Sequence, residues 1–248
     1  MKTCLINGSM RKGSTYHITH MILSKLDQHC DNEITEFFLP KDMPDFCAGC
    51  YQCIYNGENR CPHASSVEKI HQAMLEADLI IITSPVYVFD VSGQLKALLD
   101  HFGYQWMSHR PHEAMFKKIG LSVVTAAGAG MKSTSSTICT NLTWWGLKRV
   151  YSFDQAVMAS SYAEIPSKIM EDIEKKTSKM ARKLSKSLKN KAQLNPTMKT
   201  RFLFNLMKMM KKGHPEWNAL DHEFWKKSGY FLSKKPWRDT LESTVERG

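Results

Sequence analysis

The 248-residue sequence has no long hydrophobic run. No stretch approaches the ~18 consecutive apolar residues of a transmembrane helix, and the amino terminus opens directly on a strand pattern, without the basic and then apolar segments of a signal peptide. We therefore expect a cytoplasmic protein that neither spans nor binds a membrane. Hydrophobic residues still make up 42% of the chain, so low-hydrophobicity disorder is also excluded.

The sequence also lacks an even set of spaced cysteines and the common nucleotide motifs. Neither a Walker A motif nor a GxGxxG dinucleotide fingerprint occurs, and no pyridine-nucleotide motif is recognisable. The seven cysteines are an odd number, and four of them fall between positions 47 and 61. This crowding indicates metal or redox chemistry and argues against a disulfide framework.

Positive charge is scarce in the first two thirds of the chain, although the net charge is +10. Residues 1–164 carry 14 Lys and Arg against 15 Asp and Glu, whereas residues 165–248 carry 20 against 9. Only this C-terminal excess suggests a nucleic-acid or membrane module, and we expect no nucleic-acid partner.

Strand and helix patterns alternate along most of the chain. The buried run Leu79–Thr83 is typical of a parallel strand covered on both faces. This alternation predicts a doubly wound α/β fold, with a flavodoxin-like parallel sheet of five strands in the order 2-1-3-4-5. The expected strands are 2–6, 33–38, 79–83, 119–125 and 150–153; the expected helices are 15–26, 67–75, 94–102, 134–145 and 167–189.

A composition change near Asn195-Pro196 predicts two domains, residues 1–190 and a basic, aromatic-rich helical extension over 191–248. In residues 197–212 we expect one apolar helical stripe made of Met198, Phe202, Leu206 and Met209 or Met210, widened by Leu203, Phe204 and Met207. So much apolar surface needs a partner. We predict that residues 197–237 pack on the core or on a partner chain and help to wall the active site.

Three loops that follow predicted strands carry the candidate ligand-binding residues. The first, Asn7–Thr15, offers backbone N–H groups, three hydroxyls, a guanidinium and the start of a helix, which suits a terminal phosphate. The second, Ser84–Lys96, places two aromatic side chains at the sheet edge, where they can flank a planar ring. The third, Thr125–Gly130, lacks bulky side chains and permits close backbone approach to a ligand. Each alone also fits an ordinary turn or core cap.

The segments GSMRKGST and SPVYVFDVSGQLKALLD resemble the NADPH-dependent FMN reductase family of flavodoxin-like flavoproteins, over roughly residues 1–155. The resemblance implies bound FMN and NAD(P)H as co-substrate. It implies an FMN phosphate site at Ser9, Arg11, Gly13, Ser14 and Thr15, and an isoalloxazine site at Pro85, Val86, Tyr87, Val88, Phe89 and Gly128. It also implies a homodimer or homotetramer.

The cysteine motif is Cys47-x₂-Cys50-x₂-Cys53-x₇-Cys61. Four thiolates so spaced can form a Cys₄ shell, and the motif resembles the iron-sulfur flavoprotein branch of the same family, which implies a [4Fe-4S] cluster. Relatives with similar segments keep ordinary thiols, and residues 62–66 (PHASS) replace the acidic stretch usual in the family. Zinc is a third, less favoured alternative, because two x₂ gaps crowd a single tetrahedral ion.

We expect no catalytic acid, base or nucleophile, because the cofactor carries hydride chemistry. His63, His71, His101, His109 and His112 are interpreted as surface or locally bonded residues. The expected function is FMN-dependent oxidoreduction, from NAD(P)H or a reduced carrier to a small-molecule or protein acceptor. The alternative is an iron-sulfur flavoprotein that carries electrons for ferredoxin-like partners.

Overall fold

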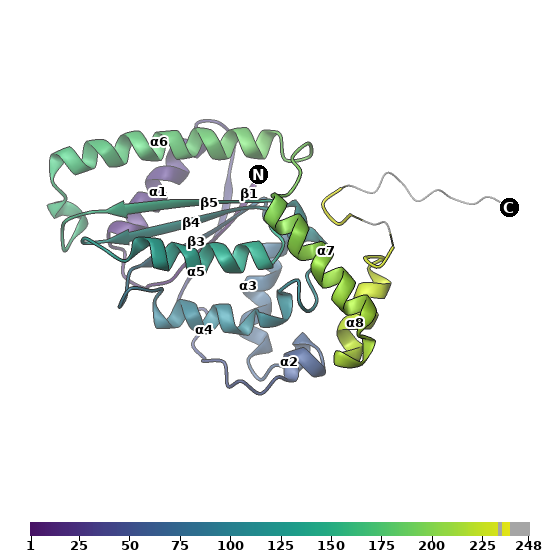
Figure 1. Cartoon of the computed structure of the whole chain (residues 1–248). Helices are drawn as coiled ribbons and strands as arrows, with labels where there is room; N and C mark the ends of the chain where they lie inside the picture. Colours follow the sequence, from purple (N-terminus) through teal and green to yellow (C-terminus); the bar gives the residue numbers. More distant parts are fainter. Residues whose placement is uncertain (233–234, 239–248) are drawn as a thin grey trace.

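The computed structural model describes residues 1–232 and 235–238, and its centre is a five-stranded parallel sheet (Figure 1). The strand order is β2-β1-β3-β4-β5, and every neighbouring pair is parallel. The predicted fold class and strand order are therefore confirmed. The strands are β1 (Lys2–Asn7), β2 (Glu33–Phe38), β3 (Leu79–Pro85), β4 (Ile119–Ala126) and β5 (Arg149–Ala156).

Helices cover both faces of this sheet. On one face, α1 (Ser14–Asp27) and α6 (Ser167–Lys189) pack together over alternate strand residues such as Leu5 and Ile81. On the other, α3 (Ala64–Glu76), α4 (Gly93–His101) and α5 (Met131–Trp144) cover Ile80 and Ile82. All eight residues of β4 are buried, as central parallel strands require. Figure 1 shows the two helical layers on opposite sides of the sheet.

Short helices complete the connections. They are α2 (Gln52–Tyr55), η1 (Glu58–Arg60), η2 (Gly103–Gln105), η3 (Glu113–Lys117), η4 (Tyr162–Glu164) and η5 (Pro215–Trp217). Among the described residues, no helix has the length and hydrophobicity needed to cross a membrane.

The C-terminal extension forms α7 (Met198–Gly213) and α8 (Ala219–Lys227), at one end of the molecule (Figure 1). It packs on the core through an aromatic cluster centred on Phe204, which stacks on Trp225 at 5.2 Å and meets the ring of Phe116 edge-on at 5.4 Å. The expected packing on the core is thus confirmed within the described residues. Positions 233–234 and 239–248 of the extension lie outside them.

The apolar stripe predicted for α7 is correct only in part. Phe204 and Met207 are buried, and Leu203, Leu206 and Met210 pack against the aromatic cluster, but the other predicted residues are exposed. The buried residues of this helix are Thr200, Phe204, Met207 and Lys211, whereas Met198, Phe202 and Met209 are 85%, 65% and 65% exposed. Both sets repeat at helical spacing, because the sequence is apolar on more than one side. Aromatic partners decided which face is buried, and those partners come from elsewhere in the chain.

Candidate functional site

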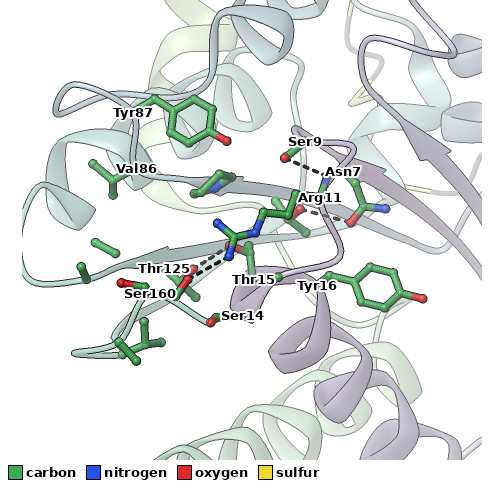
Figure 2. A pocket seen from close by; sticks show the side chains of 17 residues that line it. Asn7, Ser9, Arg11, Ser14, Thr15, Tyr16, Val86, Tyr87, Thr125 and Ser160 are labelled. Atoms are coloured by element: carbon green, nitrogen blue, oxygen red, sulfur yellow. Dashed lines mark hydrogen bonds between the residues drawn. The ribbon is translucent and has the colours of Figure 1, made fainter. Parts of the chain in front are cut away.

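A cavity opens at the carboxyl ends of β1, β3 and β4, between the loops that follow these strands (Figure 2). This is the crevice where open α/β sheets bind ligands, because β1 and β3 connect to helices on opposite faces. The lining residues are Asn7, Ser9, Arg11, Gly13, Ser14, Thr15, Tyr16, Thr83, Pro85, Val86, Tyr87, Thr125, Ala126, Ala127, Val157, Ala159 and Ser160.

The loop after β1 is arranged as an anion site. Helix α1 begins after Gly13, which provides no side-chain cap, so the first-turn N–H groups and the positive end of the helix dipole face the cavity. Arg11 extends across the opening, and its Nη2 donates to Ser160 O at 2.8 Å (Figure 2). The Arg11 backbone N–H donates to Ser9 Oγ at 3.1 Å. A positive side chain and uncapped N–H groups therefore share one wall.

Tight packing fixes the floor below this loop. A Cβ on Gly8 would lie 2.6 Å from Thr83 O, so only glycine lets β1 turn away beside β3. The hydroxyls of Thr15 and Thr125 are 2.6 Å apart and buried, which joins α1 to the end of β4. These contacts hold the anion wall in position relative to the sheet.

The loop after β3 ends in a strained hairpin. Tyr87 and Asp90 exchange two backbone hydrogen bonds, of 2.9 and 3.1 Å, across Val88 and Phe89. Both turn residues have positive φ, +50° and +63°, where Asn or Gly normally stands. Val88 is 96% exposed and Phe89 67% exposed, so no burial compensates the strain. Tyr87 lies at the cavity and its ring borders the opening (Figure 2).

Most of the predicted ligand-binding residues line this cavity. Val88, Phe89 and Gly128 do not, because the hairpin tip points into solvent and no atom lies within 4 Å of a Cβ built on Gly128. Those that do are Ser9, Arg11, Gly13, Ser14, Thr15, Pro85, Val86 and Tyr87.

The sequence analysis missed one wall of the cavity. The segment after β5 contributes Val157, Ala159 and Ser160, and it carries no recognisable motif. Its position follows only from the pairing of β5 with β4, although the end of a fifth parallel strand was the place to search. Tyr16 and Thr83 were missed as well.

The four motif cysteines gather in the segment between β2 and α3, away from the cavity lining. Cys47 and Cys50 are exposed, and Cys53 and Cys61 are partly buried. Burial raises the pKa of Cys53, and the nearby Cys61, Cys47 and Cys50 raise it further, so the four thiols lie within electrostatic range of one another. Within the described residues, no three of these sulfurs fall within 4.8 Å of one another, and none of the four lines the cavity.

Arg110 holds the cysteine segment from the core side. Its guanidinium donates to Cys53 O and, at 3.1 Å, to Ile54 O, and it is only 6% exposed. Asn218, the N-cap of α8, donates to the same Ile54 carbonyl at 3.1 Å. The backbone of α2 is therefore fixed by side chains from distant parts of the chain, and Figure 1 shows α2 beside α8.

Asp221 in α8 is the counter-ion of this arrangement. It is fully buried and accepts from Arg110 Nη1 at 2.6 Å, from Lys211 Nζ at 2.7 Å and from His109 Nδ1 at 2.8 Å. Burial raises the pKa of Asp221, but the hydrogen bonds from His109 and Lys211 outweigh this effect and leave it below its ordinary value. We name Arg110 and Asp221 the clamp.

The extension therefore supports the cysteine segment instead of the cavity. Within the described residues, no cavity-lining residue comes from 197–237, so inside one chain the extension does not wall the cavity as expected. His109 bonds to Asp221, 112 residues further along the chain, and burial lowers the pKa of His71, whose Nδ1 is 3.4 Å from Tyr104 Oη.

Comparison with known proteins identifies one relative over most of the chain and another over part of it. An iron-sulfur flavoprotein of Archaeoglobus fulgidus is 26% identical over 232 residues, which cover 93% of this chain and 100% of that protein. An iron-sulfur flavoprotein of Methanocaldococcus jannaschii is 40% identical over 103 residues, 40% of this chain and 51% of its own length.

Solved structures share the fold at low identity. An NAD(P)H:quinone oxidoreductase from Methanothermobacter marburgensis matches 74% of this chain and 98% of its own, with a TM-score of 0.58 and 14% identity. An NADH:FMN oxidoreductase matches 81% of this chain and 93% of its own, with a TM-score of 0.51 and 18% identity. The model of the NADPH-dependent FMN reductase family matches residues 1–164. The chain therefore belongs to the NADPH-dependent FMN reductase family and is an FMN-dependent oxidoreductase.

Proposed function

We propose that the cavity of Figure 2 binds FMN with its phosphate at the start of α1 and its ring beside Tyr87. One observation carries this proposal: an uncapped helix N-terminus and Arg11 lie together at the crevice of a parallel sheet. A dianionic phosphate there would accept charge-assisted hydrogen bonds. The carbonyl of Ser160 already orients the guanidinium, so little side-chain freedom is lost when the phosphate binds.

The open side of the cavity suits exchange of electrons with a second molecule. When bound, FMN supplies both two-electron and one-electron chemistry. The chain positions the flavin ring: Pro85 and Val86 border the ring site, and Tyr87, 45% exposed, flanks its entrance. We propose NAD(P)H or a reduced carrier as donor and a small molecule or protein as acceptor.

We further propose a [4Fe-4S] cluster on Cys47, Cys50, Cys53 and Cys61. Two observations support it: the thiols influence each other electrostatically, and curated relatives are named iron-sulfur flavoproteins. The spacing disfavours zinc on the four cysteines, because two sulfurs on one tetrahedral zinc lie about 4 Å apart, and no three of the described sulfurs lie within 4.8 Å of one another. Free thiols remain the alternative, as does an electron-carrier role without NAD(P)H oxidation.

Anaerobic purification followed by flavin, iron and sulfide analysis tests this function. We expect one FMN released per chain on denaturation, four iron and four sulfide per chain as for one [4Fe-4S] cluster, and flavin bleaching by NAD(P)H. Recovery of FAD alone, or of no flavin after reconstitution, contradicts the FMN assignment. Cys50→Ser should lose iron and sulfide but keep FMN, because Cys50 does not line the cavity.

The identity of the electron donor separates an NAD(P)H-oxidising enzyme from an electron carrier. Steady NAD(P)H oxidation with an added quinone or dye acceptor supports the enzyme. Reduction only by a ferredoxin-type protein supports the electron carrier. A homodimer or homotetramer and a cytoplasmic location stay predictions; the exposed Val88 and Phe89 beside the cavity support association, which the mass in solution tests.

A further inference from the structure

Three metal-ligating side chains converge where the cysteine segment meets α3 and α4. The ligand atoms of Cys61, His63 and His101 all lie within 4.8 Å of one another. His63 Nδ1 is 2.9 Å from His101 Nε2, and the two ring centroids are 5.2 Å apart. None of the three lines the cavity of Figure 2. This trio is therefore a separate site, and it shares only Cys61 with the proposed cluster.

His101 is held in the tautomer that binding a metal through Nε2 requires. It is 3% exposed, at the end of α4, and its Nδ1 is 2.7 Å from the carbonyl oxygen of Ala97. Only a protonated Nδ1 can donate to a carbonyl, so Nε2 carries the lone pair and faces His63. A backbone carbonyl that accepts from the second ring nitrogen is the usual support of a metal-bound histidine.

His63 completes the pair. It is the N-cap residue of α3, yet its side chain makes no cap hydrogen bond and points to His101 instead. Two lone pairs at 2.9 Å repel, so either a proton or a cation must lie between the nitrogens. A metal ion can replace that proton if His63 moves its own proton to Nε2.

Cys61 supplies the third ligand. It is partly buried two residues before His63, and the backbone N–H of His63 hydrogen-bonds to its sulfur. One thiolate and two imidazoles are a ligand set that zinc accepts. On a tetrahedral zinc, the two nitrogens would lie roughly 3.3 Å apart and each would lie roughly 3.5 Å from the sulfur. Small side-chain rotations reach these distances from the present ones.

We propose that Cys61, His63 and His101 bind one Zn²⁺, with water at the fourth position. Both Cys61 and His63 are partly exposed, which leaves that position open to solvent. Binding releases the thiol proton of Cys61 to solvent, and His63 only changes tautomer. The site does not depend on FMN binding. Because Cys61 also belongs to the proposed cluster, zinc binds only to a chain that holds no cluster.

Zinc titration of the metal-free, reduced chain against a chromophoric chelator tests the site. We expect one tightly bound Zn²⁺ per wild-type chain. His63→Gln and His101→Gln should each weaken binding at least about 100-fold, since loss of a ligand exceeds the 10- to 100-fold loss typical of outer-shell changes. His29→Gln, which changes an exposed histidine, is the matched control and should bind as wild type. Because His101 is buried, the partly exposed His63 is the decisive variant.

Cys47→Ser separates this site from the four-cysteine motif. It should retain zinc and lose iron and sulfide, whereas His63→Gln should lose zinc and retain iron and sulfide. Preloaded zinc should lower cluster reconstitution in the wild type but not in His63→Gln. Zinc that is lost in Cys47→Ser and kept in His63→Gln overturns the proposal, as does a wild-type chain that binds none. A chain that forms no cluster but binds zinc still supports the zinc site.

Discussion

The cavity and the cysteine segment are held in different ways. Each loop of the cavity follows directly from a strand, so the sheet itself sets the positions of Arg11, Tyr87 and Ala127. The cysteine segment belongs to no strand. Its backbone is fixed at Cys53 and Ile54 by the clamp and by Asn218, from elements more than 50 and 160 residues further along the chain.

This difference predicts where each region is vulnerable. Damage to the cavity should change ligand affinity and leave the rest of the fold intact, because the sheet is buried on both faces. Damage to the clamp should release the extension and the cysteine segment together. The sheet therefore positions the cavity, while the C-terminal extension stabilises the cysteine segment.

Asp221→Ala is the strongest test of the clamp. The change removes the buried counter-ion of Lys211 and leaves Arg110 only its longer pair with the half-exposed Glu58, at 3.4 Å. We expect a loss of about 3–5 kcal/mol in the free energy of unfolding, the usual result of breaking a buried ion pair. Chemical denaturation measures it. Faster alkylation of Cys53 should accompany the loss, while FMN affinity of the folded fraction stays unchanged.

The control is Asp172→Ala, because Asp172 forms an exposed pair with Lys176 at 2.6 Å. It should cost at most about 0.5 kcal/mol.

The stability contributed by the clamp should also depend on pH. The pKa of Asp221 is lower in the folded chain than the ordinary 3.8, so its contribution is full above that value and declines as pH falls through the folded pKa. The stability difference from Asp221→Ala should shrink accordingly. A constant difference contradicts the clamp.

Arg11→Ala tests the cavity by comparison. Loss of a charge-assisted phosphate contact should weaken FMN binding by about 1.5–3 kcal/mol, roughly 10- to 150-fold. Arg11 is exposed, and within the described residues its side chain hydrogen-bonds only to the Ser160 carbonyl, so the free energy of unfolding of the FMN-free chain should hardly change. Fluorescence titration with FMN measures the affinity. Lys12→Ala, at a neighbouring exposed position, is the control; equal losses in both variants would mean general electrostatic attraction.

The same comparison explains what the sequence could predict. The strand patterns and the turn after each strand predicted the sheet, its strand order and the cavity loops, because both signals are local in the sequence. Open parallel sheets bind ligands at the carboxyl ends of their strands, and this rule placed the loops at one site. Sequence spacing also identified four neighbouring cysteines. It did not reveal the clamp, since nothing near Arg110 or Asp221 marks them as partners.

Two errors have the same origin. On α7, two apolar faces compete, and the rings of Phe116 and Trp225, which lie elsewhere in the chain, select the face that contains Phe204. The Ser160 segment was missed because its role depends on the end of β5, not on its own residues. His63 and His101 were interpreted as surface or locally bonded residues, and their closeness to each other and to Cys61 needs the docking of α4 beside α3.

Val88→Asn gives the smallest expected effect and sharpens the boundary of the cavity. A β-branched residue at φ +50° is strained, and Asn tolerates this region. Because Val88 is 96% exposed, the change removes no buried surface, so we expect a gain of about 0.5–1 kcal/mol in stability. Val88→Thr keeps the branched side chain and should gain nothing. Denaturation curves of both variants measure this, and equal stability contradicts strain at the hairpin.

The FMN affinity of Val88→Asn should stay within about threefold of wild type, because Val88 does not line the cavity. A tenfold loss would place its side chain against the flavin.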